Sequence, residues 1–163
     1  MAKAAEIIDI VSDKAIFGDT CGINEMFTMT TVPDQKRAIA FALSEAVADM
    51  ITHREGPATE LPSHQLQLAH RLFIGCDRHP VLRDALVSGF CVGAVQVLQR
   101  EASPAATFQR LVDYAVGETS PHVLAGALRD AVRPAIRIHS ALSENPQDNP
   151  FVTNFNRLNL VAG

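Results

Sequence analysis

Three arginines at four-residue spacing are the side chains most suggestive of binding chemistry. Arg129, Arg133 and Arg137 drift by only about 80° around a helix, so they share one face. Such a row of guanidinium groups attracts phosphates or carboxylates, which predicts a site for a polyanion or nucleic acid. The alternative is a solvated face, or arginines paired with acids from other helices. Asp130 lies at the edge of the row, and the net charge of −4 opposes polyanion binding. The opposite, core-facing side of this helix would carry Leu124, Leu128, Ala131, Ala135, Ile138 and Leu142.

A cysteine and a histidine close together suggest a second kind of chemistry. Cys76 and His79 stand at Cys-x2-His spacing, with His70 upstream. A zinc site needs three or four ligands, and the sequence has no second Cys-x2-Cys or His-x3-His element to complete one. Cys76 or Cys21 could instead act as a nucleophile beside a base. The alternative is a plain turn between helices, whose Asp77 or His79 caps the next helix.

The motifs of the common nucleotide-dependent enzymes are absent from the sequence. It contains no Gly-x-Gly-x-x-Gly, no Gly-x4-Gly-Lys-Ser/Thr and no Gly-x-Ser-x-Gly. One Tyr and no Trp leave few side chains on which nucleic-acid bases could stack. We therefore expect no catalytic residues, no metal and no cofactor. A metal- or thiol-dependent enzyme centred on Cys76 and His79 is kept as an alternative.

The elements that must position these side chains are all predicted to be helices. Apolar residues recur at three- and four-residue spacing, and prolines stand where first helical turns begin. Helices are expected over residues 3–16, 33–53, 63–75, 80–100, 104–117 and 121–142, with a loop over 54–62 and a kink at Pro134. Two glycines and several β-branched residues in 17–32 predict a loop or a short extended segment. The fold class is an all-α bundle of five to six helices.

The segment 80–100 is predicted to be the central helix, because it is apolar nearly all round. Such a helix belongs in the middle of a bundle or in an oligomer interface. Gly89 and Gly93 lie on one of its faces, and each costs about 1 kcal/mol in helix propensity. Close approach of another backbone would compensate, although a buried helix could also simply tolerate two glycines. Its uncharged stretch, 85–99, is shorter than the roughly twenty residues that cross a bilayer, so no membrane span is expected.

Residues 144–163 are predicted to form an extended C-terminal docking arm of the helical domain 1–143. The arm is rich in Asn and Pro, yet Phe151, Phe155 and Leu158 give it apolar surface. It would dock on its own bundle or on a neighbouring subunit. Together with the glycine-bearing helix, the arm predicts a non-enzymatic, self-associating structural or adaptor subunit that forms a homo-oligomer.

The compartment is predicted from the start of the chain and from its cysteines. Glu6 and Asp9 interrupt the apolar stretch that a secretory signal would need. The three cysteines are odd in number and widely spaced, unlike those of disulfide-stapled secreted domains. We therefore expect a cytoplasmic protein with reduced thiols.

Overall fold

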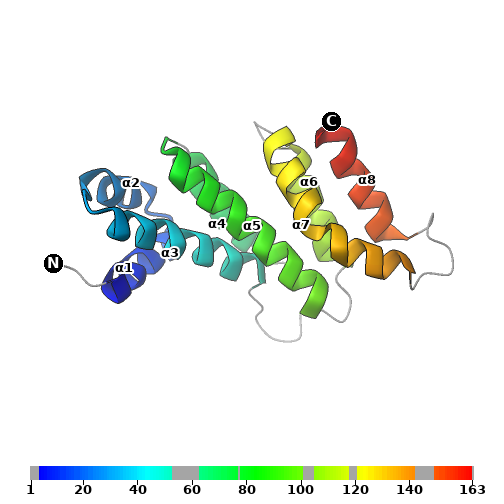
Figure 1. The fold of residues 1–163 in the computed structure, drawn as a ribbon, viewed down its shortest axis with the longest axis horizontal. Helices are drawn as coiled ribbons and strands as arrows, with labels where there is room; N and C mark the ends of the chain where they lie inside the picture. The colour runs from blue at the N-terminus through cyan, green and yellow to red at the C-terminus, as the bar shows by residue number, and fades with distance from the viewer. Residues whose placement is uncertain are drawn as a thin grey trace. The chain divides into compact units, whose positions relative to one another are not determined.

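The structure is a computed structural model that describes residues 4–52, 63–76, 78–100, 105–117, 121–141 and 149–162 (Figure 1). Within these ranges every regular element is a helix and no strand occurs, which confirms the all-α class. The loop predicted over 54–62 lies outside the described residues, as does the expected capping residue Asp77.

The described residues form eight helices, more than the five or six predicted. They are α1 (Ala4–Ile16), α2 (Thr20–Met29), α3 (Pro33–Thr52), α4 (Ser63–Gly75), α5 (Pro80–Arg100), α6 (Ala105–Gly117), α7 (Pro121–Ala141) and α8 (Pro150–Ala162). Six of them match the predicted ranges to within a few residues. The two additional helices, α2 and α8, fall in segments that were predicted not to be helical.

The first additional helix, α2, replaces the loop or extended segment predicted over 17–32. Gly18 adopts a positive φ of 67°, which suits glycine and reverses the chain after α1. Asp19 then caps the new helix, since its Oδ1 accepts a hydrogen bond from the Gly22 N–H at 2.9 Å. Ile23 and Phe27, one turn apart, are both buried. The prediction was wrong because burial of this apolar pair outweighs the low helix propensity of the surrounding residues.

The chain folds into two compact units. Unit 1 comprises Met1–Ile51 and Ser63–Phe90, and unit 2 comprises Thr52–Pro62 and Cys91–Gly163. Helix α5 contributes its first half to unit 1 and its second half to unit 2. The single domain over 1–143 with an arm over 144–163 stays a prediction.

Unit 1 is built around the buried faces of α3 and α5. Leu43 on α3 and Phe90 on α5 are fully buried, and the Phe90 ring meets the edge of Phe73 from α4 at 6.0 Å between centroids. Helices α3 and α5 are in close contact at Gly89. A Cβ atom at Gly89 would collide with the backbone carbonyl of Ser44 on α3. The backbone that approaches this glycine therefore belongs to the same chain.

Helix α5 is not covered on every side. Leu82, Leu86 and Phe90 are fully buried, but Val81 is 52% and Val92 is 45% exposed. The chain's own residues therefore bury Phe90, while one flank of the helix stays exposed, and a place for α5 in an oligomer interface stays a prediction. The central position of α5 in a bundle stays a prediction.

In unit 2, α8 packs against α6 and α7, so 150–162 is a helix and not an extended arm. The Asn149 side chain accepts a hydrogen bond from the Phe151 N–H at 2.9 Å, and Pro150 occupies the first turn. Leu158 is fully buried. Arg157 forms an ion pair of 2.7 Å with Asp113 of α6. The extended conformation predicted for this segment is wrong for 150–162, because the cap and the four-residue spacing of Phe151 and Phe155 outweigh the Asn- and Pro-rich composition.

The buried face of α7 differs from the predicted one. Leu124 and Leu128 are buried as expected, but Val132 and Ile136 follow them, whereas Ile138 is 63% exposed. The ribbon of α7 bends along its length in Figure 1, and Pro134 lies inside the helix. A proline there removes one backbone hydrogen bond and crowds the carbonyl of the preceding turn. The buried set already departs from the predicted one at Val132, before Pro134, and it keeps four-residue spacing to Ile136 beyond the proline.

Candidate functional site

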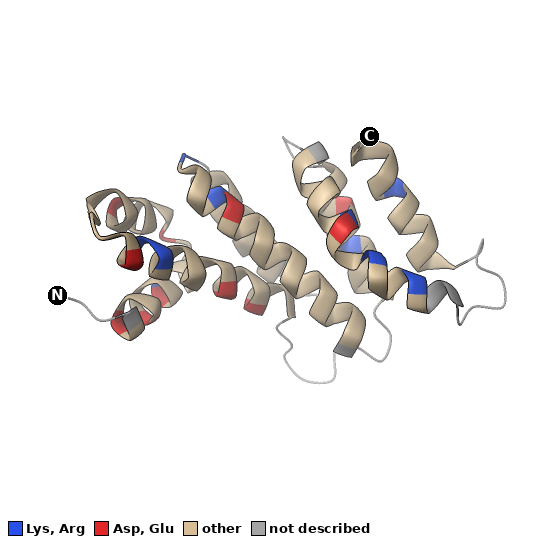
Figure 2. Ribbon diagram, viewed as in Figure 1, with Lys and Arg blue, Asp and Glu red and all other residues tan. Residues whose placement is uncertain are grey.

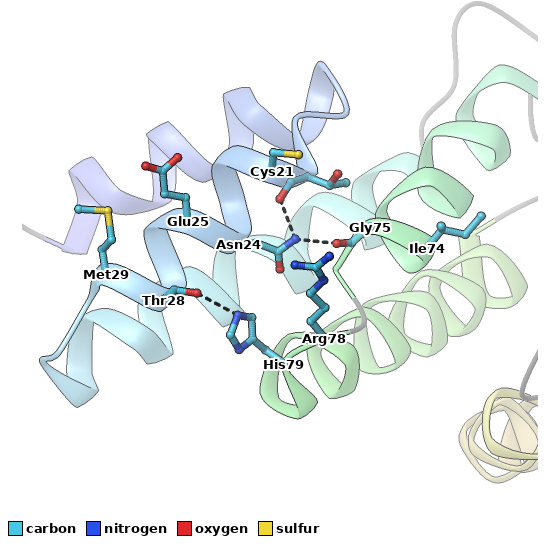
Figure 3. A pocket seen from close by; sticks show the side chains of 10 residues that line it. Cys21, Asn24, Glu25, Thr28, Met29, Ile74, Gly75, Arg78 and His79 are labelled. Carbon is cyan, nitrogen blue, oxygen red and sulfur yellow. Dashed lines mark hydrogen bonds between the residues drawn. The ribbon is translucent and has the colours of Figure 1, made fainter.

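A pocket of ≈ 540 Å³ lies in unit 1 along helix α2 (Figure 3). Its first wall is one face of α2, and its second wall is the end of α4 with the turn that leads into α5. The lining residues of α2 are Thr20, Cys21, Asn24, Glu25, Thr28 and Met29, and those of the second wall are Ile74, Gly75, Arg78 and His79.

The two walls meet where α2 begins and α4 ends. Gly75 has no side chain, and a Cβ atom there would collide with the side chain of Thr20. Asn24 donates both of its amide hydrogens to backbone carbonyls, to Thr20 O at 2.9 Å and to Gly75 O at 2.6 Å. This pair of bonds fixes the orientation of the amide. The Oδ1 atom of Asn24 is shielded from solvent and accepts no hydrogen bond from the described residues.

His79 joins the other end of α2 to the start of α5. Its Nε2 lies 3.1 Å from Thr28 Oγ1, within hydrogen-bonding distance. Its ring packs against Phe27 with 4.9 Å between centroids. Lys36 lies on the same phenyl ring, with its Nζ 4.2 Å from the centroid, a cation–π contact. The imidazole is therefore held in a defined position in the pocket wall.

Arg78 supplies a positive charge to the pocket. In Figure 3 its side chain reaches toward Asn24, whereas the Glu25 carboxylate points away from the guanidinium. The described acidic residues form no ion pair with Arg78. The pocket therefore combines a guanidinium group, an unpaired amide oxygen and a hydroxyl–imidazole pair.

The cysteine and histidines singled out in the sequence are not brought together as a metal site. Cys76 is fully buried, His79 lines the pocket and His70 is exposed on α4. Across the ranges that the structure describes, no three side chains of His, Cys, Asp or Glu gather closely enough to hold a metal ion. The second thiol considered as a nucleophile, Cys21, is exposed at the edge of the pocket.

The arginine row on α7 carries its own counter-ion. Asp130 Oδ1 lies 3.1 Å from Arg129 Nε and 3.5 Å from Arg133 Nη2. Figure 2 shows both signs of charge along this helix. The Arg133 guanidinium also lies over the Phe155 ring of α8, 6.0 Å from its centroid, and Arg137 is exposed. Anion binding by this row stays a prediction.

The residues expected at helix interfaces contact their own chain. Gly89 faces α3, and Gly93 is buried. Phe151 lies 6.0 Å from the Phe108 ring of α6. Within unit 2, the Phe155 ring lies under the Arg133 guanidinium of α7. Leu158 of the same helix is fully buried. A role for these residues between molecules stays a prediction.

Asn24, Thr28 and Arg78 line the pocket, although their residue types and spacing did not single them out. Asn24 and Thr28 lie in the segment 17–32, which was predicted to be a loop or a short extended segment. Thr20, Asn24 and Thr28 stand at four-residue spacing, so recognising α2 would have placed them on one face. Arg78 lies in a turn, and only the fold brings it beside α2.

One helix in the described part of the chain, Pro80–Gln99 of α5, is long and apolar enough to cross a membrane by length and composition alone. A buried helix in a protein core passes the same test. Burial of Leu82, Leu86 and Phe90 is consistent with that second interpretation.

Comparisons of this chain with protein families, with characterised proteins and with solved structures each found no match. The function must therefore be argued from the residues themselves.

Proposed function

We propose that this protein is a non-enzymatic, self-associating structural or adaptor subunit, and that its copies meet along the exposed flank of α5. The observation that supports the proposal is the chemistry of that flank. Val81, Ser88 and Val92 are exposed and lie within about 40° of one another around the helix. No charged residue occurs from 85 to 99. Contact of this flank with a second copy would remove the apolar surface of Val81 and Val92 from water, while the exposed Asp84 lies at the edge of the flank.

A contact between two copies of this chain is compatible with two-fold symmetry. Most soluble homo-oligomers are closed by a two-fold axis, in which the same patch of each subunit meets itself. A strongly charged patch would oppose its own copy in this arrangement, whereas this flank has a single charge, Asp84, at its edge. A cytoplasmic location is part of the same proposal, since the three cysteines would stay reduced there.

The experiment is molar mass in solution by light scattering. The wild-type chain is expected to show a mass of at least twice the 17.6 kDa of one chain. The double variant Val81→Glu/Val92→Glu, which places like charges on the flank, should be a monomer with an unchanged helical circular dichroism spectrum. The matched control is Ile138→Glu/Leu160→Glu, because these residues are 63% and 84% exposed and lie on other helices. A monomeric wild-type chain, or equal dissociation by the control, would overturn the proposal.

Truncation is less informative than substitution here. Removing residues 144–163 takes away α8 and its buried Leu158, which exposes the apolar faces of α6 and α7. A change of mass after truncation could then come from a damaged unit 2, so the flank substitutions are the sharper test.

A further inference from the structure

We propose that the pocket along α2 binds a small organic carboxylate that carries an N–H donor beside the carboxylate and an aliphatic group beyond it. This role is separate from self-association and involves other residues. The pocket volume of ≈ 540 Å³ lies within the range of small-molecule sites in proteins.

The carboxylate is assigned to Arg78. Its guanidinium group reaches into the pocket and forms no ion pair with the described acidic residues. Guanidinium binds carboxylate through two parallel hydrogen bonds, a geometry that a lysine would not offer. Helix α5 begins at Pro80, directly after the pocket residue His79, and the positive end of its dipole adds to the attraction for an anion.

The N–H of the ligand is assigned to the Oδ1 atom of Asn24, which would accept its hydrogen bond. Both of its amide hydrogens are engaged by Thr20 O and Gly75 O, so its Oδ1 can only accept. That oxygen is shielded from solvent and receives no donor from the described residues, which is costly for a polar atom. In Figure 3 the Arg78 side chain lies next to this amide. In the proposed complex the Arg78 guanidinium turns to the ligand carboxylate. The N–H group of the ligand, which stands next to that carboxylate, then donates to Asn24 Oδ1.

The aliphatic group is assigned to the end of the pocket beside Ile74. This side chain is 61% exposed and lines the second wall next to Gly75. A bare anion such as acetate would leave this apolar surface in water. A carboxylate, an adjacent amide N–H and a branched aliphatic chain together describe an N-acylated amino acid with an apolar side chain.

The test titrates the full-length, isotope-labelled protein and follows backbone amide resonances by NMR. The probe is N-acetyl-L-leucine, compared with N-acetyl-L-leucinamide, which lacks the carboxylate, and with 4-methylpentanoate, which lacks the N–H. We expect saturable shifts confined to α2, to the end of α4 and to the turn before α5. Each comparison probe should bind about tenfold or more weakly, which is the size of effect that loss of a charge-assisted or buried hydrogen bond produces.

The matched variants are Arg78→Gln and Arg83→Gln. Both arginines are exposed, but only Arg78 lines the pocket. Arg78→Gln should weaken N-acetyl-L-leucine about tenfold and leave N-acetyl-L-leucinamide unchanged, while Arg83→Gln should bind like wild type. The proposal is overturned if N-acetyl-L-leucine gives no saturable shifts in the millimolar range. Equal binding of all three probes, or equal losses in the two variants, would overturn it as well.

Discussion

Gly89 and Gly126 both stand inside helices, but their surroundings give them opposite roles. A Cβ atom at Gly89 would collide with the backbone of Ser44, which cannot rotate away as a side chain could. A Cβ atom at Gly126 would lie 3.7 Å from the Ala162 Cβ, an ordinary van der Waals contact. Helix propensity alone would favour alanine at both positions. The local packing decides which of the two glycines is required.

Substitution of each glycine by alanine should therefore change stability in opposite directions. Gly89→Ala is expected to lower the free energy of unfolding by about 1–3 kcal/mol, because overpacking forces α3 and α5 apart. Gly126→Ala is expected to raise it by up to about 1 kcal/mol through helix propensity. Urea unfolding followed by circular dichroism measures both. Equal stability of Gly89→Ala and wild type would contradict the close contact of α3 and α5.

The three cysteines differ in exposure and should differ in reactivity. Cys21 is exposed, whereas Cys76 and Cys91 are buried. A thiol reagent at about pH 8 should modify one cysteine of the native protein rapidly, and Cys21→Ser should abolish that fast phase. Rapid modification of two or three thiols in the folded protein would contradict the burial of the others.

The raised pKa of Cys91 predicts a loss of stability at alkaline pH. Burial, and secondarily the negative charge of Asp130, raise the pKa of this thiol from its ordinary value of 9.0 to about 12. Because the folded-state pKa is the higher one, the stabilising contribution is complete below about pH 9 and declines as the pH rises toward 12. Cys91→Ala should flatten this decline in the free energy of unfolding. An equally steep decline in the variant would show that other groups cause it.

Among the elements, α8 shows best how a helix obtains its stability from packing. It runs antiparallel to α7, since Ala162 lies near Gly126 and Phe155 lies near Arg133. The ion pair between Arg157 and Asp113 is more than a third exposed on both sides, so it contributes little. Apolar burial on α6 and α7 therefore provides most of the stabilisation.

A pair of leucines on α8 tests this account. Leu158 is fully buried and Leu160 is 84% exposed, although only one residue, Asn159, separates them. Leu158→Ala should lower the free energy of unfolding by about 2–5 kcal/mol. Leu160→Ala should change it by no more than about 0.5 kcal/mol. Denaturant unfolding of both variants provides the measurement, and similar losses would mean that α8 is not docked through Leu158.

For the whole molecule, the balance of charge and apolar surface sets the kind of association that is expected. The chain carries a net charge of −4, which opposes both self-association and binding to polyanions. The exposed flank of α5 attracts through apolar contact, which is independent of charge. These two contributions respond differently to salt.

Raising NaCl from about 0.15 M to about 1 M shortens the Debye length from roughly 8 Å to 3 Å. Screening weakens the repulsion between chains and leaves apolar contact intact. The molar mass measured by light scattering should therefore stay the same or increase. A decrease at high salt would assign the association to ion pairs and contradict the proposed flank.

The sequence by itself determined the all-α class and the ranges of six helices, because those signals are local. Proline in a first turn, apolar residues at helical spacing and a glycine or loop at the end all lie within one segment, as in Pro33–Thr52 and Pro80–Arg100. Helices α2 and α8 also carried local caps at Asp19 and Asn149, but their composition suggested irregular structure.

Only the tertiary structure decided which distant segments meet. Gly89 required a close backbone, but nothing near it in the chain identified Ser44 of α3 as that partner. The pocket depends on the hydrogen bond from Asn24 to Gly75, which are 51 residues apart. Such contacts are set by the shapes of whole buried faces, so residue spacing within one helix cannot reveal them.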